Sequence, residues 1–333
     1  MSTEHTAKRR RRQSDERGPE NRGAYEKGDL WFDDGNVVLV AEGTAFCVHR
    51  GVLSSKSDIF RDMFSIPQPL DEETYEGHSV VHLADLKADV YHMLAALYNG
   101  REYYHYRKRL PFNVVSALLQ MGTKYEIDDL RSEGISRLRT HLPNNLCPTF
   151  HHSFESPPNV WDNTIELSAA HIIAVINLAR KLDLHDLLPV AFYFCANLPT
   201  DIILDGYKDS HGTHWKLSSE DLKRCFNGRL MLQLHGWDQY RVVLRGVPSP
   251  FCDGGTQCRN ALATKGRSVW TSVSPTNVDA LRPLDFLGHW GLCKPCKLHF
   301  NQEREHVFNE LPSIFQLEDI VSDVWPGAFL YMS

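Results

Sequence analysis

The sequence lacks a long apolar run. No stretch of about eighteen apolar residues occurs, and the best candidate, residues 169–182, is interrupted by polar and charged side chains. The opening residues, Met-Ser-Thr-Glu-His-Thr, are polar, and the apolar stretch that a secretory signal peptide requires does not follow them. We therefore expect a soluble intracellular protein, nuclear or cytoplasmic, with no membrane association.

The common catalytic motifs are missing too. The sequence contains no Gly-x-Ser-x-Gly nucleophile turn, no Gly-x4-Gly-Lys-Ser/Thr phosphate loop and no His-Glu-x-x-His zinc helix. It also has no His-x-Glu, which a zinc-dependent nucleobase deaminase needs upstream of its cysteine pair. We therefore expect a protein without enzymatic activity.

Neither sign of charge dominates the chain. A formal net charge of −6 and a pI near 6.3 exclude chain-wide attraction to nucleic acid or anionic lipid, so a basic binding surface would have to be local. The 333 residues, 42% of them hydrophobic, are enough for two domains. The eight cysteines should stay reduced without an export signal, which favours metal ligation, redox chemistry or simple burial over disulfides.

The first 26 residues are rich in Lys, Arg, Glu, Gly and Ser, and we expect them to form a disordered basic tail. Five adjacent cations lie within it: Lys8, Arg9, Arg10, Arg11 and Arg12. Such a run suits a nuclear-import receptor or a phosphate backbone. The alternative is a solvated run that only aids solubility.

The pattern of the next hundred residues mixes strands with helices. Residues 37–41 and 44–49, separated by the turn signal Glu42-Gly43, predict a β-hairpin. Apolar residues at helical spacing within 53–64 predict a pair of helices, with serines available as caps. We then expect an exposed loop at 66–79, a strand at 80–83 and a helix at 85–97.

Two more helices are predicted at 112–124 and 128–141. Pro143 opens a stretch rich in Pro, Asn, Ser and His, so we expect a linker at 144–161, then a helical extension at 162–245 and an irregular region at 246–333. Residues 124–130 (KYEIDDL) and 181–187 (KLDLHDL) share one pattern, which predicts a helix-turn-helix in each half of the chain.

These predicted elements carry motifs that resemble those of the BTB/POZ family. The opening segment contains Asp34-Gly-Asn-Val-Val-Leu-Val, then Phe46-Cys-Val-His49-Arg50-Gly-Val-Leu53. Further on, Val81-His-Leu83-Ala-Asp85 and the helix ending Ala95-Ala-Leu97-Tyr98-Asn-Gly100 fit the middle of the family pattern. Together these motifs cover about a third of the chain.

The resemblance implies an α/β fold of the α+β kind at residues 27–143, with a small sheet flanked by helices. It implies dimerisation or the binding of partners such as cullin scaffolds and transcriptional co-regulators. The family's charged interaction pocket would fall on Asp34, His49 and Arg50, with Asp29 as the alternative for the acidic position. We expect His49 to act by packing and hydrogen bonding rather than in catalysis.

The remainder of the chain resembles the extensions of BTB proteins in mushroom-forming (basidiomycete) fungi. The resemblance rests on Ala179-Arg-Lys-Leu-Asp-Leu184, on Leu284-Asp-Phe-Leu-Gly-His-Trp290 and on the paired cysteines near the C-terminus. It implies an architecture, but no known activity.

Four cysteines flank the region that looks least regular: Cys252, Cys258, Cys293 and Cys296. Zinc favours four thiolates in a tetrahedron, and the two-residue gap of the second pair lets both sulfurs turn toward one ion. We therefore predict a structural zinc site, in which His289 or His299 could replace one cysteine. A thioredoxin-like redox pair at Cys293 and Cys296 is an alternative, although the βαβ setting for it is missing.

These observations favour a non-enzymatic adaptor that acts through a BTB/POZ domain, by dimerisation or by docking a regulatory partner, with a cullin-type ubiquitin ligase as one candidate. The alternative is a DNA-associated transcriptional regulator. In that case the basic tail and a zinc-stabilised C-terminal module, with Arg259, Lys265 and Arg267, would contact nucleic acid.

Overall fold

The computed structural model describes residues 25–66, 73–103, 105, 108–145, 164–209, 211–272, 280–281 and 285–325. The predicted import signal at residues 8–12 and most of the predicted linker lie outside these residues. The described residues form two compact units. The first contains the residues up to Tyr98 together with Tyr125–Ile127, and the second contains Asn99–Lys124 and the residues from Asp128 onward.

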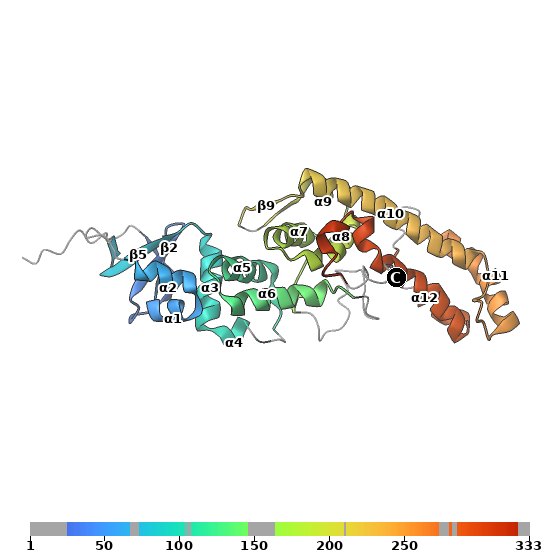
Figure 1. Cartoon of the computed structure of the whole chain (residues 1–333), viewed down its shortest axis with the longest axis horizontal. Coiled ribbons are helices and arrows are strands. Elements are labelled where there is room, and N and C mark those ends of the chain that lie inside the picture. The colour runs from blue at the N-terminus through green and yellow to red at the C-terminus, as the bar shows by residue number, and fades with distance from the viewer. Residues whose placement is uncertain are drawn as a thin grey trace, which may run out of the picture. The chain divides into compact units, whose positions relative to one another are not determined.

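The first unit is built on a five-stranded mixed sheet in the order β1-β3-β2-β5-β4 (Figure 1). Its strands are β1 (Glu26–Trp31), β2 (Val37–Ala41), β3 (Thr44–Val48), β4 (Thr74–Tyr75) and β5 (His78–Leu83). β2 runs antiparallel to β3 and parallel to β5, while β1 runs parallel to β3. The predicted mixture of a small sheet with helices is therefore confirmed.

The predicted hairpin is formed by β2 and β3, which pair from Val37 with Val48 to Ala41 with Thr44. Glu42 and Gly43 at its tip have φ angles of 47° and 75°. Positive φ at both central residues is typical of a type I′ turn, whose twist matches that of the strands. All ten residues of the two strands are buried, so the hairpin lies in the centre of the sheet.

The two edges of this sheet meet. Tyr25, which precedes edge strand β1, packs edge-on against Tyr75 of edge strand β4, with ring centroids 5.5 Å apart. The Tyr75 hydroxyl donates to the Tyr25 carbonyl oxygen, and Lys27 forms a 2.8 Å ion pair with Glu76. Because residues 74–75 belong to β4 and residues 78–79 to β5, with a two-residue turn between them, the exposed loop predicted at 66–79 is wrong for this part.

Three helices accompany the sheet: α1 (Arg50–Lys56), α2 (Asp58–Ser65) and α3 (Lys87–Tyr98). Ser57 caps α2, because its hydroxyl accepts a hydrogen bond from the Phe60 N–H and donates to the Tyr125 carbonyl oxygen. The Tyr125 ring stacks on Phe60 with a centroid distance of 4.5 Å, and its hydroxyl donates to Asp85. These contacts explain why Tyr125 belongs to the first unit.

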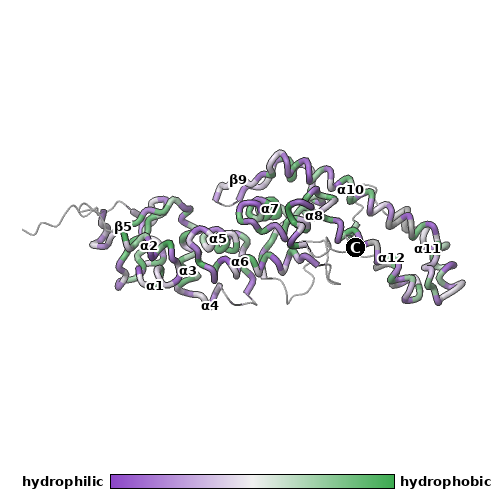
Figure 2. The backbone as a smooth tube through the Cα atoms, viewed as in Figure 1, coloured by the Kyte–Doolittle hydropathy of each residue, from purple (hydrophilic) through white to green (hydrophobic). Residues whose placement is uncertain are grey.

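The second unit is largely helical. Its helices before residue 245 are α4 (Gly100–Tyr103), α5 (Phe112–Lys124), α6 (Asp128–His141), α7 (His171–Lys181), the 3-10 turn η1 (His185–Leu187), α8 (Leu188–Ala196), α9 (Thr200–Asp205) and α10 (Ser219–Leu244). Two short strand pairs join β6 (Leu110–Pro111) to β7 (Ile165–Glu166) and β8 (Tyr207–Lys208) to β9 (His214–Trp215). The hydrophobic colour is strong in α7 and α8 (Figure 2), and every residue of α8 is buried.

The predicted bounds of α5 and α6 are confirmed. Ser218 caps α10, because its hydroxyl accepts a hydrogen bond from the Asp221 N–H. Both turns of the predicted repeat are also observed. The acidic residue of each segment, Glu126 or Asp183, has a positive φ angle, 52° or 55°, and lies between two buried apolar residues.

A third turn of this kind was missed by the sequence analysis. Residues 314–320 read IFQLEDI, and Gln316, with a φ angle of 55°, lies between the buried Phe315 and Leu317. It departs from the pattern at three positions, with Ile314 in place of lysine, Gln316 in place of the acidic residue and Ile320 in place of leucine, so the sequence gives little sign of it.

The expectation of an irregular region at residues 246–333 is wrong for most of its described part. That part contains α11 (Gly255–Ser272), the 3-10 helix η2 (Asp285–Trp290), α12 (Lys294–Asn309), α13 (Leu311–Ile314) and α14 (Glu318–Val321). In α11 the inward face begins with Cys258 and Leu262, four residues apart, and carries few large apolar side chains. Periodicity was therefore weak, and packing against α10 and η2 stabilises the helix instead.

Candidate functional site

The three residues of the predicted interaction pocket lie where β3 leads into α1. His49 is the residue before α1, and its Nε2 lies 3.2 Å from a carboxylate oxygen of Asp34. The Asp34 side chain is 86% exposed, whereas the His49 side chain is only 25% exposed. The Arg50 N–H donates to the side chain of Asn36, and the Arg50 guanidinium lies over the Phe64 ring. Asp29, the alternative acidic residue, is exposed in β1.

Two aromatic residues that sequence reasoning missed hold the His49 ring. The backbone N–H of His49 donates to the Tyr98 hydroxyl oxygen at 2.9 Å, and His49 Nδ1 lies 3.0 Å from the same oxygen. Phe32 stacks on Tyr98 with a centroid distance of 4.5 Å and also packs against His49. Burial raises the pKa of the Tyr98 hydroxyl, which keeps it protonated. This arrangement supports a packing and hydrogen-bonding role for His49.

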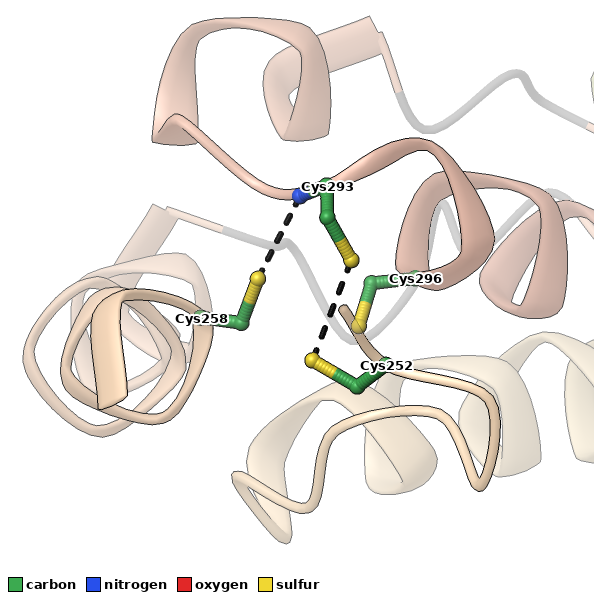
Figure 3. A group of neighbouring side chains, drawn as sticks. All are labelled: Cys252, Cys258, Cys293 and Cys296. Carbon is green, nitrogen blue, oxygen red and sulfur yellow. Dashed lines mark hydrogen bonds between the residues drawn. The ribbon is translucent and has the colours of Figure 1, made fainter. Parts of the chain in front are cut away.

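The four predicted metal-ligating cysteines come together in the second unit (Figure 3). Their sulfur atoms all lie within 4.8 Å of one another, and they form the metal-compatible group found among the described residues. Cys252 lies in the turn before α11, and Cys258 lies in the first turns of α11. Cys293 is the residue before α12, and Cys296 follows in its first turn. Three segments of the chain therefore meet at this cluster.

Backbone N–H groups point at two of the four sulfurs. The Ser249 N–H donates to Cys296 Sγ at 3.3 Å, and the Cys293 N–H donates to Cys258 Sγ at 3.2 Å. Sulfur is a better acceptor as thiolate than as thiol, so each of these two hydrogen bonds by itself favours the thiolate form of the sulfur that accepts it.

The acidity of the thiols differs across the cluster. Desolvation raises the pKa of the Cys293 thiol, but the backbone donors around it outweigh desolvation, and the pKa falls to about 7. Desolvation dominates at Cys258 and Cys296 and raises the pKa of both thiols, since both side chains are fully buried. The Cys293 thiol is therefore the most acidic of these three.

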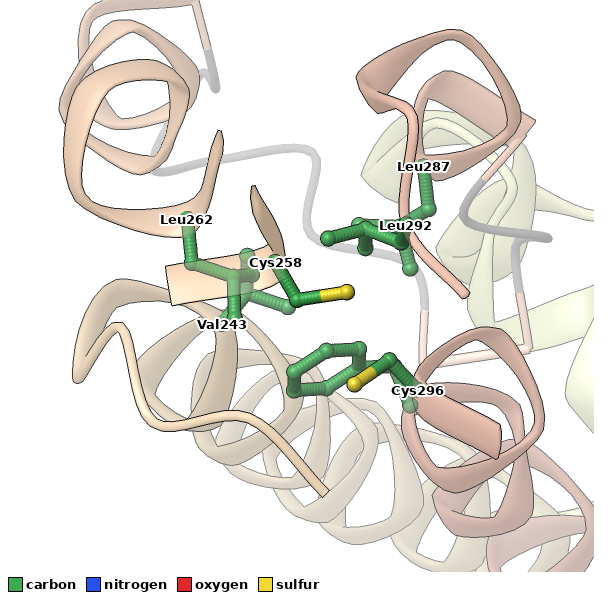
Figure 4. Packing of buried hydrophobic residues seen from close by; sticks show 7 residues of the cluster. Val243, Cys258, Leu262, Leu287, Leu292 and Cys296 are labelled. Carbon is green, nitrogen blue, oxygen red and sulfur yellow. The ribbon is translucent and has the colours of Figure 1, made fainter. Parts of the chain in front are cut away.

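A small apolar core surrounds the cluster (Figure 4). Its buried members are Val243, Cys258, Leu262, Leu287, Leu292, Cys296 and Phe300. Two of these seven residues, Cys258 and Cys296, are cysteines of the cluster, so the sulfur site is part of this apolar core. His289 and His299, the predicted substitute ligands, are not part of the metal-compatible group. The βαβ setting of a thioredoxin-like redox pair is not found near Cys293 and Cys296, because the described residues from 246 onward form only helices, turns and irregular segments.

Comparison with known protein families found one domain in this chain. Residues 32–142 match the model of the BTB/POZ domain, which is a third of the sequence and agrees with the segment predicted from its motifs. The chain therefore contains a BTB/POZ domain. No curated protein matches the chain, and the predicted likeness to fungal BTB proteins stays a prediction. Among the described helices, none combines the length and apolar character needed to cross a membrane.

Proposed function

We propose that this protein is a non-enzymatic adaptor. Its BTB/POZ domain binds a second copy of the chain or a regulatory protein such as a cullin-type scaffold, and the residues after 143 supply a second binding surface. The observation that carries the proposal is the BTB/POZ match at residues 32–142. Interaction is the common activity of such domains, and their surfaces diverge on a shared fold.

The arrangement of the sheet narrows the way in which the first unit can bind. Because Tyr25 contacts Tyr75 and Lys27 pairs with Glu76, a strand added at β1 or β4 would have to displace these side-chain contacts. We therefore propose that this unit binds through side chains of its helices and loops. Among the described residues of this unit, two large apolar side chains are exposed, Ile66 by 63% and Leu86 by 36%.

Two measurements on the full chain test the proposal. Sedimentation should reveal self-association, or affinity purification from the protein's own cells should recover a reproducible partner. The matched variant carries Ile66→Asp and Leu86→Asp, which charge the exposed apolar positions without entering the core, and it should weaken that association. A monomer that recovers no partner would contradict the adaptor function.

The alternative function, a DNA-associated regulator, can be tested with the same purified protein by measuring its binding to DNA. Lys265 donates from Nζ to the His289 carbonyl oxygen, and Arg259 is exposed on α11. The Arg267 side chain and the cations at residues 8–12 lie outside the described residues. Duplex DNA binding that weakens steeply with salt, and that is lost when residues 8–12 become alanine, would favour the regulator over the adaptor.

A further inference from the structure

We propose that one structural zinc ion binds to this protein through four thiolates, those of Cys252, Cys258, Cys293 and Cys296. These residues lie outside the BTB/POZ match, so the proposal is independent of the adaptor function. It assigns a metal to the helical C-terminal part of the chain and makes the folding of that part depend on the metal.

The spacing of the sulfurs fits a tetrahedral zinc site. With a zinc–sulfur bond of about 2.3 Å, the sulfurs of a regular tetrahedron lie about 3.8 Å apart. Cys252 Sγ and Cys293 Sγ are 3.8 Å apart, and all four sulfurs lie within 4.8 Å of one another. Shifts of an ångström or less would complete the tetrahedron. A disulfide would require about 2.05 Å between two sulfurs, and these cysteines are unpaired.

The ligand set favours zinc over other metals. Four sulfurs with no carboxylate or imidazole are the soft donors typical of structural zinc and of iron–sulfur centres. A cluster of several irons would separate its thiolates by the inorganic sulfides between the irons, whereas sulfurs this close leave room for one ion. Four protein ligands also fill the tetrahedron and leave no open position for substrate, so the site is structural rather than catalytic.

The surrounding backbone is arranged for thiolates. The amide of Ser249 donates to Cys296 Sγ, and the amide of Cys293 donates to Cys258 Sγ. Such donors orient the ligands of a metal and disperse the negative charge of a tetrathiolate site. Buried thiols that only fill space need no such donors, so the hydrogen bonds distinguish a ligand set from four small apolar side chains.

Gly254 supplies a second reason why the cluster has this shape. A Cβ atom at this position would lie 2.4 Å from Cys258 Sγ and 3.2 Å from Cys293 Cβ. A methyl group there would push the Cys258 sulfur away from the other three. Gly254→Ala therefore perturbs the geometry of the site without replacing any of the four proposed ligand residues.

The ion would join three segments that have little other core to hold them: the turn at Ser249 to Cys252, the start of α11 and the start of α12. Two of the seven buried residues of the local core are ligands. Below a certain core size, small folded regions use metals or disulfides in place of apolar burial. Metal removal should therefore loosen α11 and α12 but not the sheet of the first unit.

The test is metal analysis of the purified, tag-free full chain together with matched variants. We expect about one equivalent of zinc, and its loss in Cys258→Ser and Cys296→Ser. Cys195→Ser is the control, because Cys195 and Cys225 form another buried cysteine pair, 3.7 Å apart, and it should keep its zinc. Gly254→Ala should bind zinc more weakly, whereas Gly266→Ala in the helix that follows, α11, should not, because the nearest atom to the new Cβ would lie 3.5 Å away.

Hydrogen exchange tests the proposal in the unaltered chain, so that the result does not depend on whether the variants fold. In the unaltered chain, chelation should speed exchange at the amides of Ser249, Cys293 and Cys296 while α1 to α3 stay protected. Cobalt in place of zinc should give the visible bands of a tetrahedral tetrathiolate site. Less than about a tenth of an equivalent of zinc, with all four thiols reactive in the native chain, would overturn the proposal, and so would one equivalent of iron or a Cys252–Cys293 disulfide.

Discussion

Arg137 of α6 is a buried cation whose role sequence reasoning did not find. Its side chain is 3% exposed and forms a 2.6 Å ion pair with Glu133. The guanidinium also donates to four backbone carbonyl oxygens, those of Tyr103, His105, Lys108 and Thr164. A planar group with five donors suits this task, because it satisfies several carbonyls at once that would otherwise be buried without a partner.

Arg137→Ala should lower the free energy of unfolding of the second unit by about 3–5 kcal/mol, because it leaves those groups without their donor. Urea titration followed by the fluorescence of Trp215 would measure this loss. Arg139→Ala is the matched control on the same helix. Arg139 is 56% exposed and pairs with one carboxylate, Asp186, whose side chain is 11% exposed, so its loss should cost about 1–2 kcal/mol, less than the loss of Arg137. Equal losses in the two variants would contradict the role given to Arg137.

His171 should make the stability of the second unit depend on pH. Its ring stacks on Phe112 with a centroid distance of 4.7 Å, and its Nε2 lies 3.0 Å from the Tyr207 hydroxyl. Burial lowers the pKa of the His171 imidazole below its usual value of 6.5, and the smaller effect of Asp209 acts in the opposite direction. The folded chain therefore prefers the neutral ring more strongly than the unfolded chain does.

Because this pKa is lowered on folding, the stabilisation by His171 is complete above pH 6.5 and is lost as pH falls through the folded pKa. Thermal unfolding of the native chain should shift to lower temperature between pH 7.5 and 5. In His171→Gln, which cannot take up a proton, the shift should be smaller. If the two chains lose the same stability over this interval, His171 is not the titrating group.

At the scale of elements, α5 and α6 pack closely because glycines lie between them. A Cβ atom on Gly122 would come within 2.6 Å of the Arg131 backbone nitrogen, and one on Gly134 would come within 2.5 Å of the Leu119 side chain. The helix bounds were predictable, since each helix has its own apolar period and end signals. The closeness of the pair was not, because a glycine inside a helix gives no sign of what it faces.

Gly122→Ala should destabilise the second unit by about 1–3 kcal/mol, although alanine is the better helix former. The clash is with backbone, so the helices must separate. Gly51→Ala in α1 is the control: its Cβ has no neighbour within 4 Å, and the change should be neutral or stabilising. Chemical denaturation of the unaltered protein, Gly122→Ala and Gly51→Ala would show whether the steric clash or the higher helix propensity of alanine has the larger effect on stability. A stabilised Gly122→Ala chain would mean that α5 and α6 pack less tightly than described.

At the scale of the whole molecule, the segments on the two sides of the predicted linker belong to one unit. Several contacts join residues 110–141 to residues 164–186: the β6–β7 pairing, Phe112 on His171, Arg137 with Thr164, Gln120 with Lys181, and Arg139 with Asp186. The domain boundary predicted near residue 143 stays a prediction. These contacts show that a boundary in sequence there is compatible with close association in space.

A chain cut between residues 150 and 156, through an inserted specific protease site, should therefore remain one particle. Both pieces should elute together in native size exclusion and separate only in denaturant. Adding Arg137→Ala to the cut chain removes the contact with Thr164 and should make the pieces separate at a lower denaturant concentration. Separate elution in native buffer would instead favour a BTB/POZ segment that folds independently of the extension.

The sequence by itself determined several local elements and the BTB/POZ domain at residues 32–142. The turn at Glu42-Gly43, the caps at Ser57 and Ser218 and the bounds of α5 and α6 depend on signals within a few residues of one another, and the BTB/POZ motifs follow from them. Only the tertiary structure decided that four cysteines up to 44 positions apart converge, that the sheet edges meet, and that α11 is a helix. Those outcomes depend on contacts between residues distant in sequence, where local pattern carries little information.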